Sequence, residues 1–162
     1  MEYLPLCDKY LPGFPIAYIG FDIFYARRFL QVPNVSFNIL QKVLIGPAGD
    51  RFLRDARAAD RAVFVWTVNE VRMMRWSIRK EVDGVITDDP GKFIEVRDEY
   101  DGQYTEDDQL TFKAYLSIVG INILAACFGM FFRWRWGFRI GSMVGRNVVQ
   151  YRDLLPGTKK QA

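Results

Sequence analysis

The sequence predicts an α/β fold with a parallel sheet covered by helices, followed by one long apolar helix. Short apolar runs alternate with amphipathic segments over residues 1–100, which indicates strands and helices in turn. The strands are apolar at consecutive positions, as expected where both faces of a sheet are buried. After an acidic linker at 101–112, a run of 19 residues at 114–132 carries no charge.

Four short apolar runs predict the strands, and each ends at a glycine or at polar residues. They are Pro15–Gly20, Val35–Asn38, Val63–Val68 and Gly84–Asp88. The third run, in VFVWTVNE, is the clearest and stops abruptly at Asn69 and Glu70. Ligands bind at the carboxyl ends of parallel strands, so Thr67, Asn69 and Glu70 mark a candidate site. The structural alternative is that Asn69 caps the next helix and Trp66 fills the core.

Amphipathic segments between the strands predict helices at Asp22–Leu30, Asp50–Asp60, Glu70–Lys80 and Lys92–Tyr100. In the second, Phe52, Leu53 and Ala56 lie toward one side of the helix. The third repeats apolar residues at helical spacing. Asp89 is a good N-cap for the last helix and Pro90 fits its first position.

The composition limits the chemistry that this chain can perform. The sequence contains no histidine, which removes the commonest general acid/base and the commonest metal ligand. Cys7 and Cys127 are far apart, and Cys127 lies inside the apolar run, so two reduced thiols are predicted. The first residues lack the basic start and apolar stretch of a signal peptide, so no N-terminal signal is predicted.

Residues 113–133 are predicted to form a transmembrane helix. At about 1.5 Å per residue, the uncharged run can cross a hydrocarbon layer of about 30 Å. Lys113 precedes the run and Arg133-Trp134-Arg135-Trp136 follows it, which is the basic and aromatic anchoring of a membrane interface. A buried core helix is the competing interpretation. Gly120 and Gly129 are too far apart for a GxxxG face, so helix pairing is not predicted.

The formal net charge of +3 arises from an excess of basic residues near the end of the sequence. Residues 1–100 carry 14 basic and 14 acidic side chains, whereas residues 133–162 carry 7 basic and 1 acidic. The basic tail at 134–162 is predicted to lie on an anionic headgroup surface. Its apolar residues, which also argue against a nucleic-acid tail, are Phe138, Ile140, Met143 and Val144.

Two motifs resemble a known family. FVWTVNE at 64–70, followed after a helix by VDGVITDDP at 82–90, is similar to the closing strands of the glycerophosphodiester phosphodiesterase family. That family ends its barrel with a W-T-V-N strand and a D-G-[VI]-[IT]-T-D-x-P strand. The stretch at 14–44 also resembles the fungal branch with the phosphatidylglycerol-specific phospholipase C, whose members can carry a C-terminal membrane anchor. The resemblance covers roughly residues 1–100, and the two motifs at this spacing are specific.

The resemblance implies the C-terminal half of a TIM-type (β/α)8 barrel, followed by one transmembrane helix. Such a barrel needs about 250 residues, whereas only 100 residues precede the linker. A half barrel exposes two sheet edges and its apolar inner residues. We therefore expect a missing N-terminal half, self-association or a truncated sequence.

The resemblance also implies a substrate cleft lined by Trp66 and by Phe37, with Asn69 at the strand end beside them. The family uses an early His-Arg-Gly motif, a Glu-x-Asp pair and a second histidine, with a divalent cation such as Mg²⁺ or Ca²⁺ on the phosphoryl oxygens. None of these motifs has a counterpart here, so no catalytic residue and no metal ligand is assigned. Asp88 and Asp89 could suggest a metal site, but a polar strand end with an N-cap is the preferred interpretation.

Two functions follow from this comparison. The first is a membrane-anchored phosphoric diester hydrolase of lipid metabolism, acting on glycerophosphodiesters or on glycerophospholipids such as phosphatidylglycerol, whose C-terminal part is not active alone. The second is a non-catalytic membrane-anchored remnant that binds lipid or a partner. The expected location is a membrane, crossed once near the C-terminus. Orientation stays open, because the positive-inside rule places the tail in the cytoplasm, whereas insertion without a signal would leave residues 1–100 there.

Overall fold

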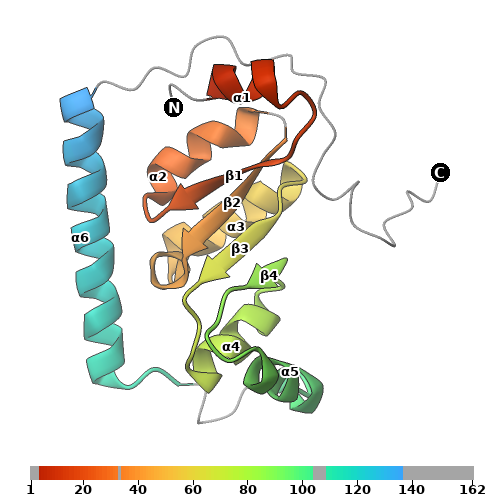
Figure 1. Cartoon of the computed structure of the whole chain (residues 1–162). Helices are drawn as coiled ribbons and strands as arrows, with labels where there is room; N and C mark the ends of the chain where they lie inside the picture. Colours follow the sequence, from red (N-terminus) through yellow and green to blue (C-terminus); the bar gives the residue numbers. More distant parts are fainter. Residues whose placement is uncertain (1–3, 33, 104–108, 137–162) are drawn as a thin grey trace.

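The computed structural model describes residues 4–32, 34–103 and 109–136, and its centre is a four-stranded parallel sheet (Figure 1). The strands are β1 (Ile16–Gly20), β2 (Val35–Leu40), β3 (Val63–Trp66) and β4 (Gly84–Val85). Each strand pairs in parallel with the next one along the chain, so the spatial order is β1-β2-β3-β4. The predicted parallel sheet is confirmed.

Helices connect and flank these strands. They are α1 (Leu4–Tyr10), α2 (Ile23–Ala26), α3 (Pro47–Ala58), α4 (Val71–Arg79), α5 (Pro90–Glu99) and α6 (Phe112–Trp136), with 3-10 turns η1 (Arg27–Gln31) and η2 (Gln41–Leu44). Consecutive parallel neighbours without a reversal of order are the arrangement of a (β/α) barrel. A doubly wound sheet would instead reverse its order at a switch point.

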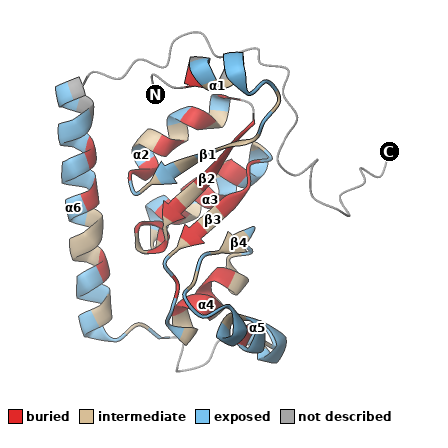
Figure 2. Ribbon diagram, in the orientation of Figure 1, coloured by how far each residue is buried: buried red, intermediate tan, exposed pale blue. Residues whose placement is uncertain are grey.

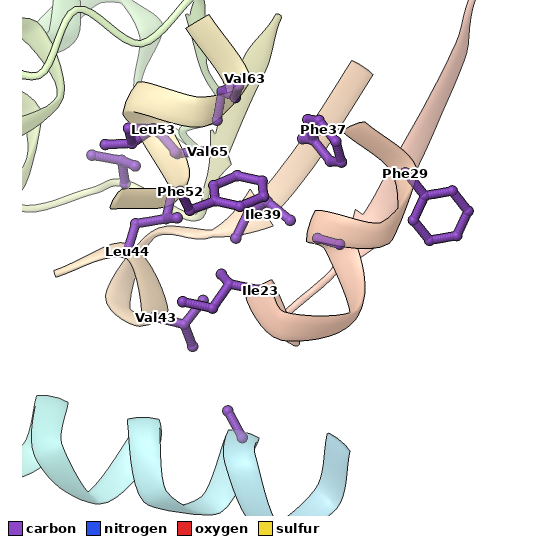
Figure 3. Close-up of a cluster of buried hydrophobic side chains, with 14 of the residues drawn as sticks. Ile23, Phe29, Phe37, Ile39, Val43, Leu44, Phe52, Leu53, Val63 and Val65 are labelled. Carbon is purple, nitrogen blue, oxygen red and sulfur yellow. The ribbon is translucent and has the colours of Figure 1, made fainter. Parts of the chain in front are cut away.

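One face of the sheet packs against helices. Tyr18 and Phe37 are register partners on this face. The ring of Phe37 meets Phe52 of α3 with centroids 5.1 Å apart, and Tyr18 meets Phe29 of η1 at 5.2 Å. Figure 3 shows Phe37 and Phe52 within the buried apolar cluster. Figure 2 shows that burial is concentrated in β2, β3 and the helices beside them, whereas α6 is largely exposed.

Polar contacts join the helices on this side of the sheet. The side chain of Gln41 is buried in η2, and its Nε2 donates to the Met73 carbonyl and to Ser77 Oγ of α4, both at 2.8 Å. Lys80 pairs with Asp50 of α3 at 2.6 Å. Because a buried amide without partners is costly, the Gln41 contacts fix η2 against α4.

The predicted helices at Glu70–Lys80 and Lys92–Tyr100 are confirmed as α4 and α5. Asp89 is the N-cap of α5, since its Oδ1 accepts the Lys92 amide at 3.0 Å, and Pro90 is the first helical residue. The N-cap prediction is therefore correct.

Several element boundaries differ from the prediction. α3 begins at Pro47, because proline suits the first helical turn and needs no amide partner there. The segment predicted as one helix at Asp22–Leu30 divides into α2 and η1. β4 contains two residues, since the chain turns away at Thr87 and Asp88 toward the Asn69 side chain. α1 and η2 were not predicted.

The long apolar helix is confirmed as α6, which covers all of the predicted 113–133 segment. Within it, Phe112–Phe132 is long and apolar enough to cross a membrane, judged by length and composition. Both cysteines are free thiols. Linker residues 104–108 lie outside the described residues. So does the predicted tail beyond residue 136, with its apolar residues Phe138, Ile140, Met143 and Val144.

Gly49 tests the packing of α3 on η2. A Cβ built on Gly49 would overlap the backbone carbonyl of Leu44, whereas one on Gly91 of α5 would meet its nearest atom at 3.6 Å. We expect Gly49→Ala to lower the free energy of unfolding by about 1–3 kcal/mol, because backbone must move. The matched Gly91→Ala change should alter it by less than about 1 kcal/mol. Denaturant unfolding of both variants measures this, and equal stability would contradict the packing described.

Candidate functional site

The four strands deliver their following loops to one edge of the sheet, because they run parallel. The chain leaves β1 at Gly20, β2 at Leu40, β3 at Trp66 and β4 at Val85. In barrels and open parallel sheets this carboxyl edge carries the ligand site. Trp66 and Asn69 both lie at this edge.

Trp66 lies on the sheet face opposite the core helices. Side chains alternate between faces along a strand, so Asn38, Phe64 and Trp66 point away from the face of Phe37. The Trp66 ring is half-buried, and its Nε1 donates to the Asn38 carbonyl at 3.2 Å. This bond fixes the indole at the carboxyl end of β3, on a face that a ligand could reach.

Phe37 lies on the other face and is 0% exposed. Its ring contacts Phe52 and Tyr18, which belong to the core between the sheet and the helices. The structure therefore does not bring Phe37 together with Trp66 on a cleft wall. Side chains alternate between the two faces along β2, so a shift of one position moves a side chain to the other face. The resemblance assigned Phe37 to the cleft without information on this alternation.

Asn69 joins the loops that follow β3 and β4. Its Nδ2 donates to Asp88 Oδ2 at 2.5 Å, and its Oδ1 accepts the Asp88 amide at 3.0 Å and the Thr87 hydroxyl at 3.1 Å. The alternative in which Asn69 caps α4 is wrong, because the N-cap is Glu70 and no side chain caps that helix. Asn69 is exposed, so it orders the loops while remaining open to a ligand.

The carboxylates at this edge do not form a metal site within the described residues. Asp88 Oδ2 is held by Asn69, and Asp89 Oδ1 caps α5. In the part of the chain that the structure describes, no three His, Cys, Asp or Glu residues group to hold a metal. Among the described residues there is thus no ligand set that fits the divalent cation implied by the resemblance, and we derive no step through it.

Two ionisable groups are perturbed by burial. Desolvation raises the pKa of Tyr25 in α2 to about 12, with Arg28 opposing the shift and Asp22 adding to it. Burial also lowers the pKa of Arg61, and the charge of Asp60 opposes this. Arg61 precedes β3 at the amino edge, so it takes no part in the carboxyl-edge site.

α6 packs beside the carboxyl ends of β1 and β2, a contact that the sequence analysis missed (Figure 1). Ile118, Ala125 and Gly129 are buried on its inner side, and Asn122 Nδ2 donates to the Lys42 carbonyl of η2 at 3.1 Å. A Cβ on Gly129 would overlap the carboxylate of Asp22, the N-cap of α2. The sequence signal was present, since small or polar residues recur at helical spacing within an apolar run.

Residues 22–92 match the family model described as the Glycerophosphoryl diester phosphodiesterase family. The matched segment runs from the N-cap of α2 into the first turn of α5 and contains β2, β3 and β4. Residues 22–92 are thus similar to that family, whose domains have a TIM-barrel-like α/β fold. No curated protein and no solved structure shows a significant match to the chain.

Substitutions at Gly129 and Gly120 provide a matched pair of variants that tests how α6 packs on the rest of the structure. A Cβ on Gly120 has no atom within 4 Å, whereas one on Gly129 overlaps Asp22. Gly129→Ala should weaken docking by about 1–3 kcal/mol relative to Gly120→Ala, since alanine improves helix propensity equally in both. Faster amide hydrogen exchange in η2 and at the start of α2 measures the loss. Identical exchange in the two variants would show that α6 does not dock there.

Tyr25 predicts a loss of stability at alkaline pH. Its pKa in the folded state is about 12, above the ordinary 10.0, so the folded protein holds the proton more tightly. The stabilisation is complete below pH 10 and is lost as the pH rises toward 12. In Tyr25→Phe, unfolding free energies measured at about pH 9 and about pH 11 should differ less than in the unmodified protein. Tyr10→Phe, at an exposed ring, is the control and should leave the difference between the two unfolding free energies unchanged.

Proposed function

We propose that residues 22–92 are the carboxyl-terminal strands and helices of a glycerophosphodiester phosphodiesterase barrel that works at a membrane. One observation carries this proposal. The family match falls on strands that are parallel and ordered as consecutive strands of a barrel. The proposed substrates are glycerophosphodiesters or glycerophospholipids such as phosphatidylglycerol.

In this proposal, the chain supplies a wall of the substrate site. Trp66 offers its ring on the open face at the carboxyl edge, and Asn69 holds the loops after β3 and β4 in place. A flat indole can pack against the glycerol or acyl part of a substrate. The acid–base groups come from elsewhere, because the sequence contains no histidine.

The proposed membrane anchor is α6. Its apolar segment of 21 residues reaches about 32 Å as a helix, enough for a hydrocarbon core of about 30 Å. Its outward side chains are large, apolar and exposed, a surface that lipid solvates better than water. An anchor of this kind would hold the chain at a membrane, where a glycerophospholipid substrate lies.

The second candidate is a non-catalytic membrane protein that binds lipid or a partner. The absence of histidine favours it, together with the lack of a grouped metal-ligand set in the described residues. This candidate predicts no hydrolysis by any assembly that contains the chain.

Complementation distinguishes the two candidates. The purified chain with Mg²⁺ or Ca²⁺ should not hydrolyse glycerophosphocholine or phosphatidylglycerol vesicles. Adding the amino-terminal half of a family barrel, with its His-Arg-Gly and Glu-x-Asp motifs, should restore turnover. Trp66→Ala should then lower kcat/KM by about tenfold through lost apolar contact. With glycerophosphocholine, a substrate that needs no membrane, Trp134→Ala at an exposed ring of α6 is the matched control.

Each outcome of this assay has a meaning. Association of the two halves by gel filtration without turnover would contradict the proposed hydrolase. Turnover by the chain alone would eliminate the non-catalytic candidate and would require acid–base groups other than histidine.

A further inference from the structure

One side of α6 fits closely against the rest of the chain (Figure 1). Ile118 and Gly129 are buried on this side, and a Cβ on Gly129 would overlap the Asp22 carboxylate. Asn122 Nδ2 donates to the Lys42 carbonyl of η2 at 3.1 Å. These contacts hold α6 along the loops that follow β1 and β2, which belong to the carboxyl edge of the sheet.

The opposite side of α6 is apolar and open. Among its exposed side chains are Leu116, Ile123, Leu124, Phe128 and Phe131. The most apolar stretch of Phe112–Phe132 is only 11% buried. A helix that is apolar on all sides is normally buried in a protein core or in a membrane. In its docked position, α6 has neither environment on its outer side.

The docked position of α6 and a membrane-spanning position exclude one another. Asn122, which contacts η2, lies at the middle of Phe112–Phe132. In a spanning helix this part lies in the hydrocarbon core. The loops of the domain cannot follow it there, because their backbone polar groups would lose water. Insertion of α6 into a membrane therefore requires that the helix leave η2 and the start of α2.

The inner side of α6 is suited to lipid as well as to the domain. Besides the Lys42 carbonyl, Asn122 Nδ2 contacts the Ile118 carbonyl of its own helix at 2.9 Å. This second bond stays with the helix after release, so the amide keeps a partner in hydrocarbon. No charged residue lies between Lys113 and Arg133. The helix can therefore exchange the domain for a bilayer without placing a charge in lipid.

The docked helix covers part of the edge that carries the candidate site. Phe21 follows β1 and Val43 follows β2, and both line a cleft whose other wall is α6. Trp66 ends β3 at the same edge. The linker at 101–112 can reach about 40 Å when extended, so it permits α6 to move away. Release of α6 would thus uncover the carboxyl edge at β1 and β2.

We infer that α6 is a lid that a membrane releases. The helix docks on the carboxyl edge when no bilayer is present and leaves this edge when it enters a bilayer. The inference rests on the proposed function, with α6 as the membrane segment. It adds regulation to that function, because the edge at β1 and β2 is then open only at a membrane. A bilayer that binds the released helix alone shifts the population toward that form.

Thiol labelling and hydrogen exchange of the full chain test this release. Cys127 is exposed on α6 and reports insertion, and Cys7→Ser makes it the single thiol. The protein is compared in lipid-free buffer and after reconstitution in vesicles of phosphatidylcholine and phosphatidylglycerol. In vesicles, a charged maleimide should label Cys127 at least about tenfold more slowly. Amide exchange in η2 and at the start of α2 should become at least about tenfold faster, whereas exchange in β3 should not change.

Gly129→Ala and Gly120→Ala separate docking from insertion. Both add one methyl group to the apolar segment, so both favour lipid equally. Only the methyl group on Gly129 overlaps Asp22 in the docked position. Because docking competes with insertion, Gly129→Ala should raise partition of the protein into these vesicles about tenfold relative to Gly120→Ala.

A second pair serves if Gly129→Ala does not fold. Asn122→Ala removes the donor to the Lys42 carbonyl, whereas Ser117→Ala removes a hydroxyl from an exposed position of the same helix. Asn122→Ala should raise vesicle partition by about threefold or more relative to Ser117→Ala, since it alone removes a docking hydrogen bond.

Three results would overturn the inference. The first is a Cys127 thiol that is protected in vesicles while η2 and the start of α2 exchange as slowly as in buffer. The second is equal vesicle partition of the two variants in each pair. Either result would leave the membrane anchor standing. The third, a Cys127 thiol that stays reactive in vesicles, would contradict the anchor and the lid together. None of these measurements needs hydrolysis, so the complementation assay judges the proposed hydrolase separately.

Discussion

The connections of this parallel sheet can cover only one of its faces. Right-handed crossovers between consecutive strands place their helices on the same side. Ring contacts place α3 and η1 against the face of Phe37 and Tyr18. The other face carries Ile19, which is 68% exposed, and the half-buried Trp66. In a closed barrel such residues form the inner layers, so closure of the barrel would bury the apolar side chains of this open face.

The two sides of α6 carry different kinds of side chain. Its inner side is small or polar at Asn122, Ala125 and Gly129, which lets the helix approach η2 and the start of α2 closely. Its outer side exposes large apolar residues that water solvates poorly. A free transmembrane helix needs no such inner side, and a core helix would not leave the outer side bare. α6 therefore combines a side that fits the domain with an exposed apolar side.

Local patterns predicted the elements well, and tertiary contacts decided the rest. Asp89 and Pro90 predicted the start of α5, because helix capping depends on residues that are adjacent in the sequence. The early end of β4 was not predictable, because it depends on a contact between Asp88 and Asn69, which are 19 residues apart in the sequence. Trp66 lies at the carboxyl edge on the open face, whereas Phe37 lies on the helix-covered face, because side chains alternate between faces along a strand. The small and polar positions of α6 recur at helical spacing in the sequence, but their partner, the Lys42 carbonyl of η2, could not be read from that spacing.

The contacts of Asn69 also order the loops at the carboxyl edge of the sheet. Asp88 Oδ2 accepts from the Asn69 amide and Asp89 Oδ1 accepts the Lys92 amide of α5, so one oxygen of each carboxylate takes part in ordering these loops. The same bonds hold the loops after β3 and β4 together beside Trp66. Loops ordered in this way beside a half-buried indole suit the binding and orientation of a ligand. Chemistry at a phosphodiester would then depend on groups that face Trp66 from outside the described residues.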